Sequence, residues 1–230
     1  MKNGTLNKLS SEIVKEYGIN AGASVVGIAS AKDFRLAPKG FKPADNLEGC
    51  LSVIVLGAPS PKEVLRDTVE YTANRNAMLA KMSEMAKETA KRIKADGYKV
   101  KAISAAGGKW LEGDGRKEQF GFISLKHAAE LAGLGVITKN YLLTNPEYGS
   151  LLWFSAILTD ADLVPDKKVQ YDFCKNCSKC VEMCPSGALN NPASFGKKAC
   201  SQFFTMANKK LEIKCFLCRK VCPHGLGKKT

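Results

Sequence analysis

The cysteines of this 230-residue chain are concentrated near its carboxyl end, where eight of the nine fall within the last 57 residues. They form two runs, Cys174-x2-Cys177-x2-Cys180-x3-Cys184-Pro185 and Cys200-x14-Cys215-x2-Cys218-x3-Cys222-Pro223. Three closely spaced thiolates can bind three corners of an Fe4S4 cube, while the fourth corner faces away from their loop. The sequence therefore predicts two 4Fe-4S clusters.

The spacing also predicts how the cysteines pair. In the C-x2-C-x2-C-x3-C-P pattern of bacterial ferredoxins, the fourth cysteine ligates the other cluster. We therefore expect one cluster to be bound by Cys174, Cys177, Cys180 and Cys222. The other would be bound by Cys184, Cys200, Cys215 and Cys218. The proline after each fourth cysteine helps to turn the chain out of the cluster loop.

Two other kinds of cysteine chemistry compete with this interpretation. A disulfide framework is typical of short secreted domains, and this chain has neither that length nor a recognisable secretory signal. Zinc sites close on four ligands arranged as two pairs. They have no need of the third cysteine in the first run, nor of the Cys-Pro endings of both runs. Both alternatives are disfavoured.

Length and composition divide the chain in two. We expect an α/β domain over residues 1–165, long enough for a hydrophobic core of its own, and a small ferredoxin-like domain over residues 166–230. No apolar run approaches the length of about 18 residues that a membrane span needs. The amino terminus has no apolar export segment, so the sequence predicts a cytoplasmic protein, in an anaerobe or microaerophile.

The formal net charge of +13 is concentrated in the cysteine-rich part. Residues 166–230 carry 13 lysines and arginines against 4 aspartates and glutamates. Part of this charge compensates the anionic clusters. The rest predicts docking of an acidic electron donor such as ferredoxin or flavodoxin. Specific nucleic-acid binding is disfavoured, because no stripe of interleaved basic and aromatic residues is evident.

Strand-like and helix-like segments alternate over the first 160 residues, which favours an α/β or α+β class. We expect helices over residues 6–17, 68–96 and 124–134, and strands over residues 22–29, 51–56, 98–104 and 151–158. The glycine-rich segment 105–121 is predicted to be a mobile surface loop. The methionines of the long helix recur at helical spacing, which favours core packing over contact with a cofactor.

Several stretches resemble the epoxyqueuosine reductase family and its relatives, the reductive dehalogenases. They are residues 49–57 (Gly-Cys-Leu-Ser-Val-Ile-Val-Leu-Gly), 127–135 (His-Ala-Ala-Glu-Leu-Ala-Gly-Leu-Gly), 138–140 (Thr-Lys-Asn), 145–150 (Asn-Pro-Glu-Tyr-Gly-Ser) and 156–160 (Ala-Ile-Leu-Thr-Asp). The two cysteine runs follow in the family's order. The resemblance covers about residues 45–223.

The resemblance implies a nitroreductase-like, cobalamin-binding domain fused to a ferredoxin-like domain. The two clusters would then pass single electrons to the corrinoid, taking Co(II) to Co(I), for reductive chemistry on a substrate that the sequence does not identify. The residues it implies for the corrinoid pocket are His127, Gly133, Gly135, Lys139, Asn140 and Tyr148. A histidine on a helix also packs or caps in many proteins, so either role is open for His127.

The sequence departs from the family where the family carries an acidic proton donor, shortly before the Ala-Gly-Leu-Gly segment. The corresponding residues 119–124 are Gln-Phe-Gly-Phe-Ile-Ser, without an acid. The sequence also stops before the helical-repeat extension that grips transfer RNA in many members. Three interpretations therefore stay open: a corrinoid-dependent reductase, an electron-transfer protein serving a partner's corrinoid or flavin, and a flavin-binding variant of the same fold.

Overall fold

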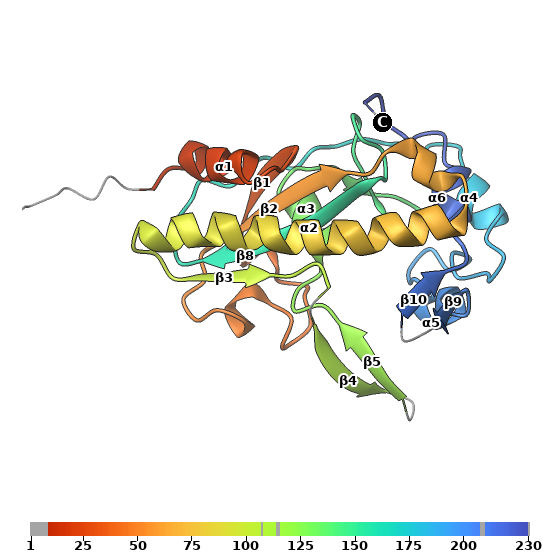
Figure 1. Cartoon of the computed structure of the whole chain (residues 1–230), viewed down its shortest axis with the longest axis horizontal. Coiled ribbons are helices and arrows are strands. Elements are labelled where there is room, and N and C mark those ends of the chain that lie inside the picture. Colours follow the sequence, from red (N-terminus) through yellow and green to blue (C-terminus); the bar gives the residue numbers. More distant parts are fainter. Residues whose placement is uncertain (1–8, 107, 114–115, 208–209, 230) are drawn as a thin grey trace, which may run out of the picture. The chain divides into compact units, whose positions relative to one another are not determined.

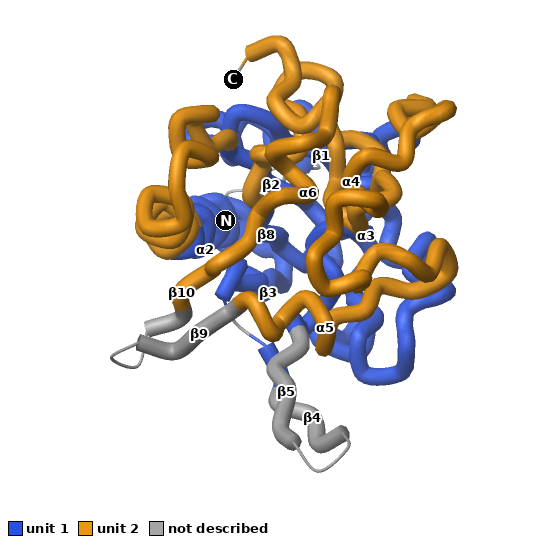
Figure 2. Tube along the Cα trace, turned by 90° about the vertical axis from the view of Figure 1, so that its right-hand side faces the viewer, with its two compact units in different colours: residues 1–58, 79–134, 154–168 blue, residues 59–78, 135–153, 169–230 orange. Residues whose placement is uncertain are grey.

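The computed structural model describes residues 9–106, 108–113, 116–207 and 210–229. Its contacts divide the chain into two compact units (Figure 2). Unit 1 comprises residues 1–58, 79–134 and 154–168, and unit 2 comprises residues 59–78, 135–153 and 169–230. The units are not consecutive along the chain, because two segments from its first two-thirds join the cysteine-rich part. The division expected at residue 165 stays a prediction about which segments fold by themselves.

A four-stranded sheet, in the order β1-β2-β8-β3, holds the main hydrophobic core (Figure 1). The strands are β1 (Val25–Ser30), β2 (Ser52–Pro59), β3 (Val100–Ile103) and β8 (Leu152–Thr159). β1 pairs antiparallel with β2, and β3 pairs antiparallel with β8. Seven successive residues of β2 are buried. A continuous apolar run, rather than an alternating one, is therefore the pattern that this strand requires.

The α-helices among the described residues of the first part of the chain are α1 (Ser11–Asn20), α2 (Thr68–Ala95) and α3 (Leu125–Leu131). The hydroxyl of Ser10 accepts a hydrogen bond from the Ile13 amide and caps α1. α2 ends just before Gly97, whose φ of 92° is left-handed backbone that glycine adopts without strain. Three short 3-10 helices lie at η1 (Ala31–Asp33), η2 (Pro43–Asp45) and η3 (Lys62–Leu65). The mixed α/β class expected from the sequence is confirmed.

The methionines of α2 pack in the interior, as expected. Met82 is fully buried, and Met78 and Met85 are 6% and 3% exposed. The described part of the chain contains no helix that combines the length and the apolar character needed to cross a membrane.

The segment expected to be a glycine-rich loop is a β-hairpin, so that expectation is wrong. β4 (Lys109–Gly113) pairs antiparallel with β5 (Arg116–Phe120). The two residues between the strands are Asp-Gly, a sequence strongly preferred in two-residue hairpin turns because both positions tolerate positive φ. The described residues on either side of Asp114 and Gly115 are therefore paired strands rather than an irregular loop.

Unit 2 is built from short elements around the cysteines. They are β6 (Val136–Ile137), β7 (Leu143–Thr144), α4 (Lys179–Glu182), α5 (Lys197–Ser201), β9 (Phe204–Ala207), β10 (Lys210–Ile213) and α6 (Leu217–Lys220). β6 pairs antiparallel with β7, and β9 with β10. The hairpin of β9 and β10 occupies most of the gap between Cys200 and Cys215, a gap for which the sequence suggested no structure.

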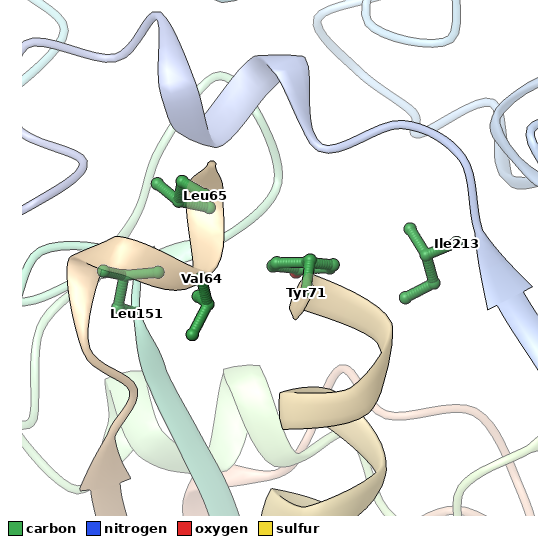
Figure 3. Packing of buried hydrophobic residues seen from close by; sticks show 5 residues of the cluster. All are labelled: Val64, Leu65, Tyr71, Leu151 and Ile213. Carbon is green, nitrogen blue, oxygen red and sulfur yellow. The ribbon is translucent and has the colours of Figure 1, made fainter. Parts of the chain in front are cut away.

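A small hydrophobic cluster anchors the approach to the second cysteine run. Figure 3 shows its buried side chains, which come from distant parts of the sequence: Val64, Leu65, Tyr71, Leu151 and Ile213. Phe216 packs against them, with its ring centroid 4.8 Å from that of Tyr71. The Ile213 amide donates to the hydroxyl of Thr72 over 3.0 Å. These contacts fix the chain on both sides of Cys215, the first ligand of its closely spaced triplet.

The buried sheet gives a direct stability prediction. Replacing Ile54, which is fully buried in β2, with alanine should lower the free energy of unfolding by about 2–5 kcal/mol, because a cavity remains. The matched control is Leu36→Ala, at a side chain 99% exposed, which should change it by less than about 0.5 kcal/mol. Urea unfolding followed by circular dichroism measures both. Equal effects of the two substitutions would contradict this packing.

Candidate metal centre

Four cysteines from both runs surround one pocket in unit 2. The pocket is lined by Cys174, Cys177, Cys180 and Cys222, together with Thr138, Asn140, Phe173 and Pro223. Cys180 lies on α4, and Cys222 lies just beyond the end of α6. The structure therefore brings the last cysteine of the second run to the first three of the first run. This is the set expected for one cluster.

The remaining four cysteines also approach one another. The pKa of the Cys218 thiol is raised to about 11: burial is the largest cause, Arg219 opposes it, and the negative charges of Cys200, Cys215 and Cys184 add to it. Burial likewise raises the pKa of Cys180 to about 11, with contributions from Cys222, Cys174 and Cys218. The cysteines whose charge acts on Cys218 are thus its expected partners.

The raised pKa values mean that these sulfurs become thiolates only when a cation binds them. A buried thiol surrounded by other thiols resists ionisation, whereas a bound metal makes the thiolate favourable and releases the proton. In the described part of the chain, no three His, Cys, Asp or Glu side chains lie close enough to ligate one metal ion. A cube does not require such closeness, since each of its four thiolates binds a different iron atom. The residues present therefore fit an iron–sulfur cube.

The turn after Cys184 directs hydrogen-bond donors at its sulfur. Burial opposes ionisation of Cys184, but the hydroxyl of Ser186 and the backbone amides of Ser186, Leu189 and Ala188 outweigh it and lower the pKa. The sulfur and the Ser186 hydroxyl oxygen are 3.5 Å apart. Gly187, with a φ of 65°, allows the tight turn that presents these donors. Cys184 is therefore prepared to act as a thiolate.

Lys139 and Asn140, which the resemblance implies for a corrinoid pocket, contact the cysteine loops. The Lys139 amide donates to the Cys174 sulfur over 3.4 Å, and its ammonium donates to the Cys177 carbonyl over 2.8 Å. Asn140 is buried, and its amide nitrogen donates to the Cys218 carbonyl over 3.3 Å. Their loop thus bridges both cysteine runs, a role that the sequence did not suggest.

The other implied corrinoid residues have local contacts of their own. His127 is exposed on α3, with its Nδ1 2.7 Å from the Ser124 hydroxyl oxygen. A side chain at Gly133 would meet the Lys167 carbonyl, and one at Gly135 would meet the Thr144 carbonyl, each at 2.5 Å. The Tyr148 ring lies 5.8 Å from the Lys229 ammonium. Close packing alone explains why glycine occupies positions 133 and 135. The role of these four residues toward a corrinoid stays a prediction.

Two further residues lie outside the cysteine motifs. Cys50 is buried, and burial raises the pKa of its thiol to about 11, which is typical of an inert thiol in the core. The His224 ring packs 5.1 Å from that of Phe173, which lines the pocket. His224 therefore lies one side chain away from the cluster cysteines.

Comparison with known families defines the class of protein. Residues 167–190 match the family model of the 4Fe-4S binding domain, so this is an iron–sulfur protein. The chain is 34% identical over 119 residues to the epoxyqueuosine reductase of Bacillus subtilis (strain 168), a match covering 47% of this chain and 31% of that enzyme. It is 34% identical over 110 residues to the enzyme of Listeria monocytogenes, covering 43% and 29%.

Solved structures extend the likeness over nearly the whole chain. A crystal structure of a selenomethionine-labelled epoxyqueuosine reductase matches with a TM-score of 0.66 at 23% identity, covering 95% of this chain and 66% of that one. A catabolic reductive dehalogenase matches with a TM-score of 0.69 at 22% identity, covering 96% and 33%. The resemblance expected from the sequence is confirmed: the chain is related to epoxyqueuosine reductases and shares its fold with them and with reductive dehalogenases. The matches span about a third of the length of the curated relatives.

Proposed function

We propose that this protein is an iron–sulfur reductase in which two 4Fe-4S clusters pass single electrons to a bound corrinoid. The corrinoid, once reduced, would supply the reductive chemistry on the substrate. The observation that carries the cluster part is the pocket where Cys222 meets Cys174, Cys177 and Cys180. The corrinoid part is supported by the relation to epoxyqueuosine reductases and by a solved reductive dehalogenase of the same fold, described as suggesting B12-dependent dehalogenation.

The contacts of Lys139 support a short path between cluster and cofactor. Its side chain is exposed, while its backbone amide donates to the Cys174 sulfur. A corrinoid in contact with Lys139 would therefore lie beside the cluster of Cys174. No other residue of the implied pocket carries the proposal as directly. The expected donor is an acidic ferredoxin or flavodoxin, attracted by the excess of lysines in residues 166–230.

One observation favours a second candidate function. A Bacillus subtilis epoxyqueuosine reductase has been described with its catalytic aspartate loop swung out of the active site, whereas residues 119–124 here contain no acid. A protein without that acid could serve as an electron-transfer protein for the corrinoid or flavin of a partner, such as a corrinoid protein. The flavin-binding variant of the fold is tested by the same experiment.

Binding of the cofactor separates these functions. Protein reconstituted anaerobically with iron and sulfide is titrated with cob(II)alamin and, separately, with FMN, and followed by visible and electron paramagnetic resonance spectra. The proposal predicts micromolar binding of cobalamin with the base dissociated and no nitrogen coupled to cobalt. His127→Ala should leave that spectrum unchanged, because His127 lies exposed beside Ser124.

Each other outcome rejects the corrinoid proposal or one part of it. Nitrogen coupling that disappears in His127→Ala would show histidine ligation. FMN binding without cobalamin binding would establish the flavin variant. Binding of neither, together with rapid reduction of a separate corrinoid protein, would establish an electron-transfer protein.

A further inference from the structure

Arg219 places a positive charge next to one cysteine of the second group. It follows Cys218 directly on α6, and its guanidinium carbon lies 5.9 Å from the centre of the Trp153 ring. The Trp153 indole donates to the buried Ser60 hydroxyl over 2.8 Å, and the Asn74 amide donates to the same oxygen. The tryptophan is therefore fixed, and with it the flat face on which the guanidinium rests.

One nitrogen of this guanidinium has no protein acceptor. The Nη1 atom of Arg219 is buried and has no hydrogen-bond partner among the residues that the structure describes. Leaving a donor of a charged group buried without an acceptor is costly. The guanidinium thus has a buried donor available for an anionic group, and Cys218 is the residue directly before it on α6.

The first cysteine run has no arginine or lysine at the position that corresponds to Arg219. Cys180 and Cys218 correspond to each other, because each is the third cysteine of its run and stands just before the x3-Cys-Pro ending. Cys180 is followed by Val181 and Glu182, whereas Cys218 is followed by Arg219 and Lys220. Lys139 does lie near the first group. Its ammonium, however, is bound to a carbonyl and its side chain is exposed, so solvent screens it more than the half-buried Arg219.

We propose that Arg219 raises the reduction potential of the cluster bound by Cys184, Cys200, Cys215 and Cys218 above that of the other cluster. This rests on the proposed function, since it requires both cubes. Each cube takes one electron from the donor, and its charge with four thiolates goes from about −2 to about −3. A nearby cation stabilises the reduced form more than the oxidised form. The Ser186 hydroxyl oxygen, 3.5 Å from the Cys184 sulfur, acts in the same direction, because hydrogen bonds to the sulfurs also set the potential of a cluster.

The consequence is an order of filling. A single electron delivered to the protein would reside on the Cys218 cluster, and the Cys174 cluster would be reduced second. Arg219 affects the reaction only through the reduction potential of the cluster, so it is a positioning residue rather than a catalytic one. Its loss should change the potential without removing iron.

The test is a redox titration of the holoprotein followed by electron paramagnetic resonance. In the wild type, the cluster whose signal changes in Cys215→Ser should have the higher midpoint potential, and the one that changes in Cys177→Ser the lower. Arg219→Gln should lower the first potential and leave the second nearly unchanged. The matched control is Lys220→Gln, an exposed neighbour with the same change of charge, whose shift should be several-fold smaller. Arg219→Lys should restore most of the potential, because the charge is retained.

The outcomes separate this inference from the function on which it rests. A wild type with one cluster or none rejects both. Two clusters with potentials that Arg219→Gln leaves unchanged, or shifts equally, reject the inference alone. If Arg219→Gln fails to retain iron, the wild-type order decides: a Cys218 cluster of lower potential than the Cys174 cluster rejects the inference.

Discussion

Replacing Cys184 with alanine should destroy the cluster of the other cysteine run. Cys184 belongs by sequence to the run of Cys174, but its sulfur contributes to the negative charge felt by Cys218, together with Cys200 and Cys215. Iron content should fall toward about half, because one cube of two loses a ligand. Iron analysis and the electron paramagnetic resonance spectrum of the reduced protein measure the loss.

Two comparisons make this result specific. Cys50→Ala removes a buried cysteine outside both groups and should leave iron and spectra unchanged. Cys222→Ala should instead damage the cluster of Cys174, Cys177 and Cys180, whose pocket it lines. Damage from Cys184→Ala confined to the cluster of Cys174, Cys177 and Cys180 would contradict the crosswise arrangement.

The cysteines could be predicted from sequence because cluster ligation depends on short local spacings. Three thiolates separated by two residues each define a loop that few other structures require. The contacts of Lys139 and Asn140 could not be predicted in the same way. They arise because the segment 138–140 lies against Cys174, Cys177 and Cys218 in the folded unit, about 35–80 residues away in sequence. The resemblance implied that these residues matter but not that they contact the cysteine loops.

The second large effect concerns the substrate: this protein should turn over epoxyqueuosine in transfer RNA poorly. One solved relative is an epoxyqueuosine reductase with a modified tRNA stem loop, and such a stem loop is the probe. Protonating a leaving oxygen needs a positioned acid, which typically contributes about 10²–10⁴ in rate. Residues 119–124 supply none, so turnover should fall below that of the Bacillus subtilis enzyme by about 10²–10⁴-fold.

Glu118, in β5, is the nearest carboxylate in sequence to that segment and provides the control. Glu118→Gln should not change the residual turnover, while reduction of free Co(II) corrinoid should proceed in both proteins. The excess of lysines should give only weak RNA binding that fades steeply with salt. Rapid, salt-tolerant turnover that Glu118→Gln abolishes would show that the acid has moved to this position and that the protein acts on RNA.

The fold could be predicted where one hydrophobic pattern dominated. The helix expected over residues 68–96 is α2, at Thr68–Ala95, because no glycine or proline interrupts it and Gly97 ends it. The strand expected over residues 151–158 is β8, shifted by one residue. The pairing of β4 with β5 was not predicted, because the glycines of residues 105–121 favoured a loop, although an Asp-Gly sequence between two segments is also a hairpin signal.

Exact helix boundaries and very short elements were not predictable. α1 begins at Ser11, five residues after the expected start, because Ser10 is the residue that caps it. β9 and β10 are four residues each, and the alternation of polar and apolar residues in Phe-Thr-Met-Ala and Lys-Leu-Glu-Ile is too short to indicate strands by itself. The role of Arg219 could not be predicted, because an arginine after a cysteine is not a distinctive pattern. Its contact with Trp153, 66 positions earlier in the sequence, forms only in the folded chain.

The most direct test of the account is the metal content and spectrum of the whole protein, reconstituted anaerobically and then reduced with dithionite. Two crosswise cubes predict about eight iron atoms and about eight acid-labile sulfides per chain. The reduced spectrum should show two 4Fe-4S centres that interact magnetically. About four iron atoms and a single isolated centre, or zinc in place of iron, would contradict the two-cluster reductase proposed here.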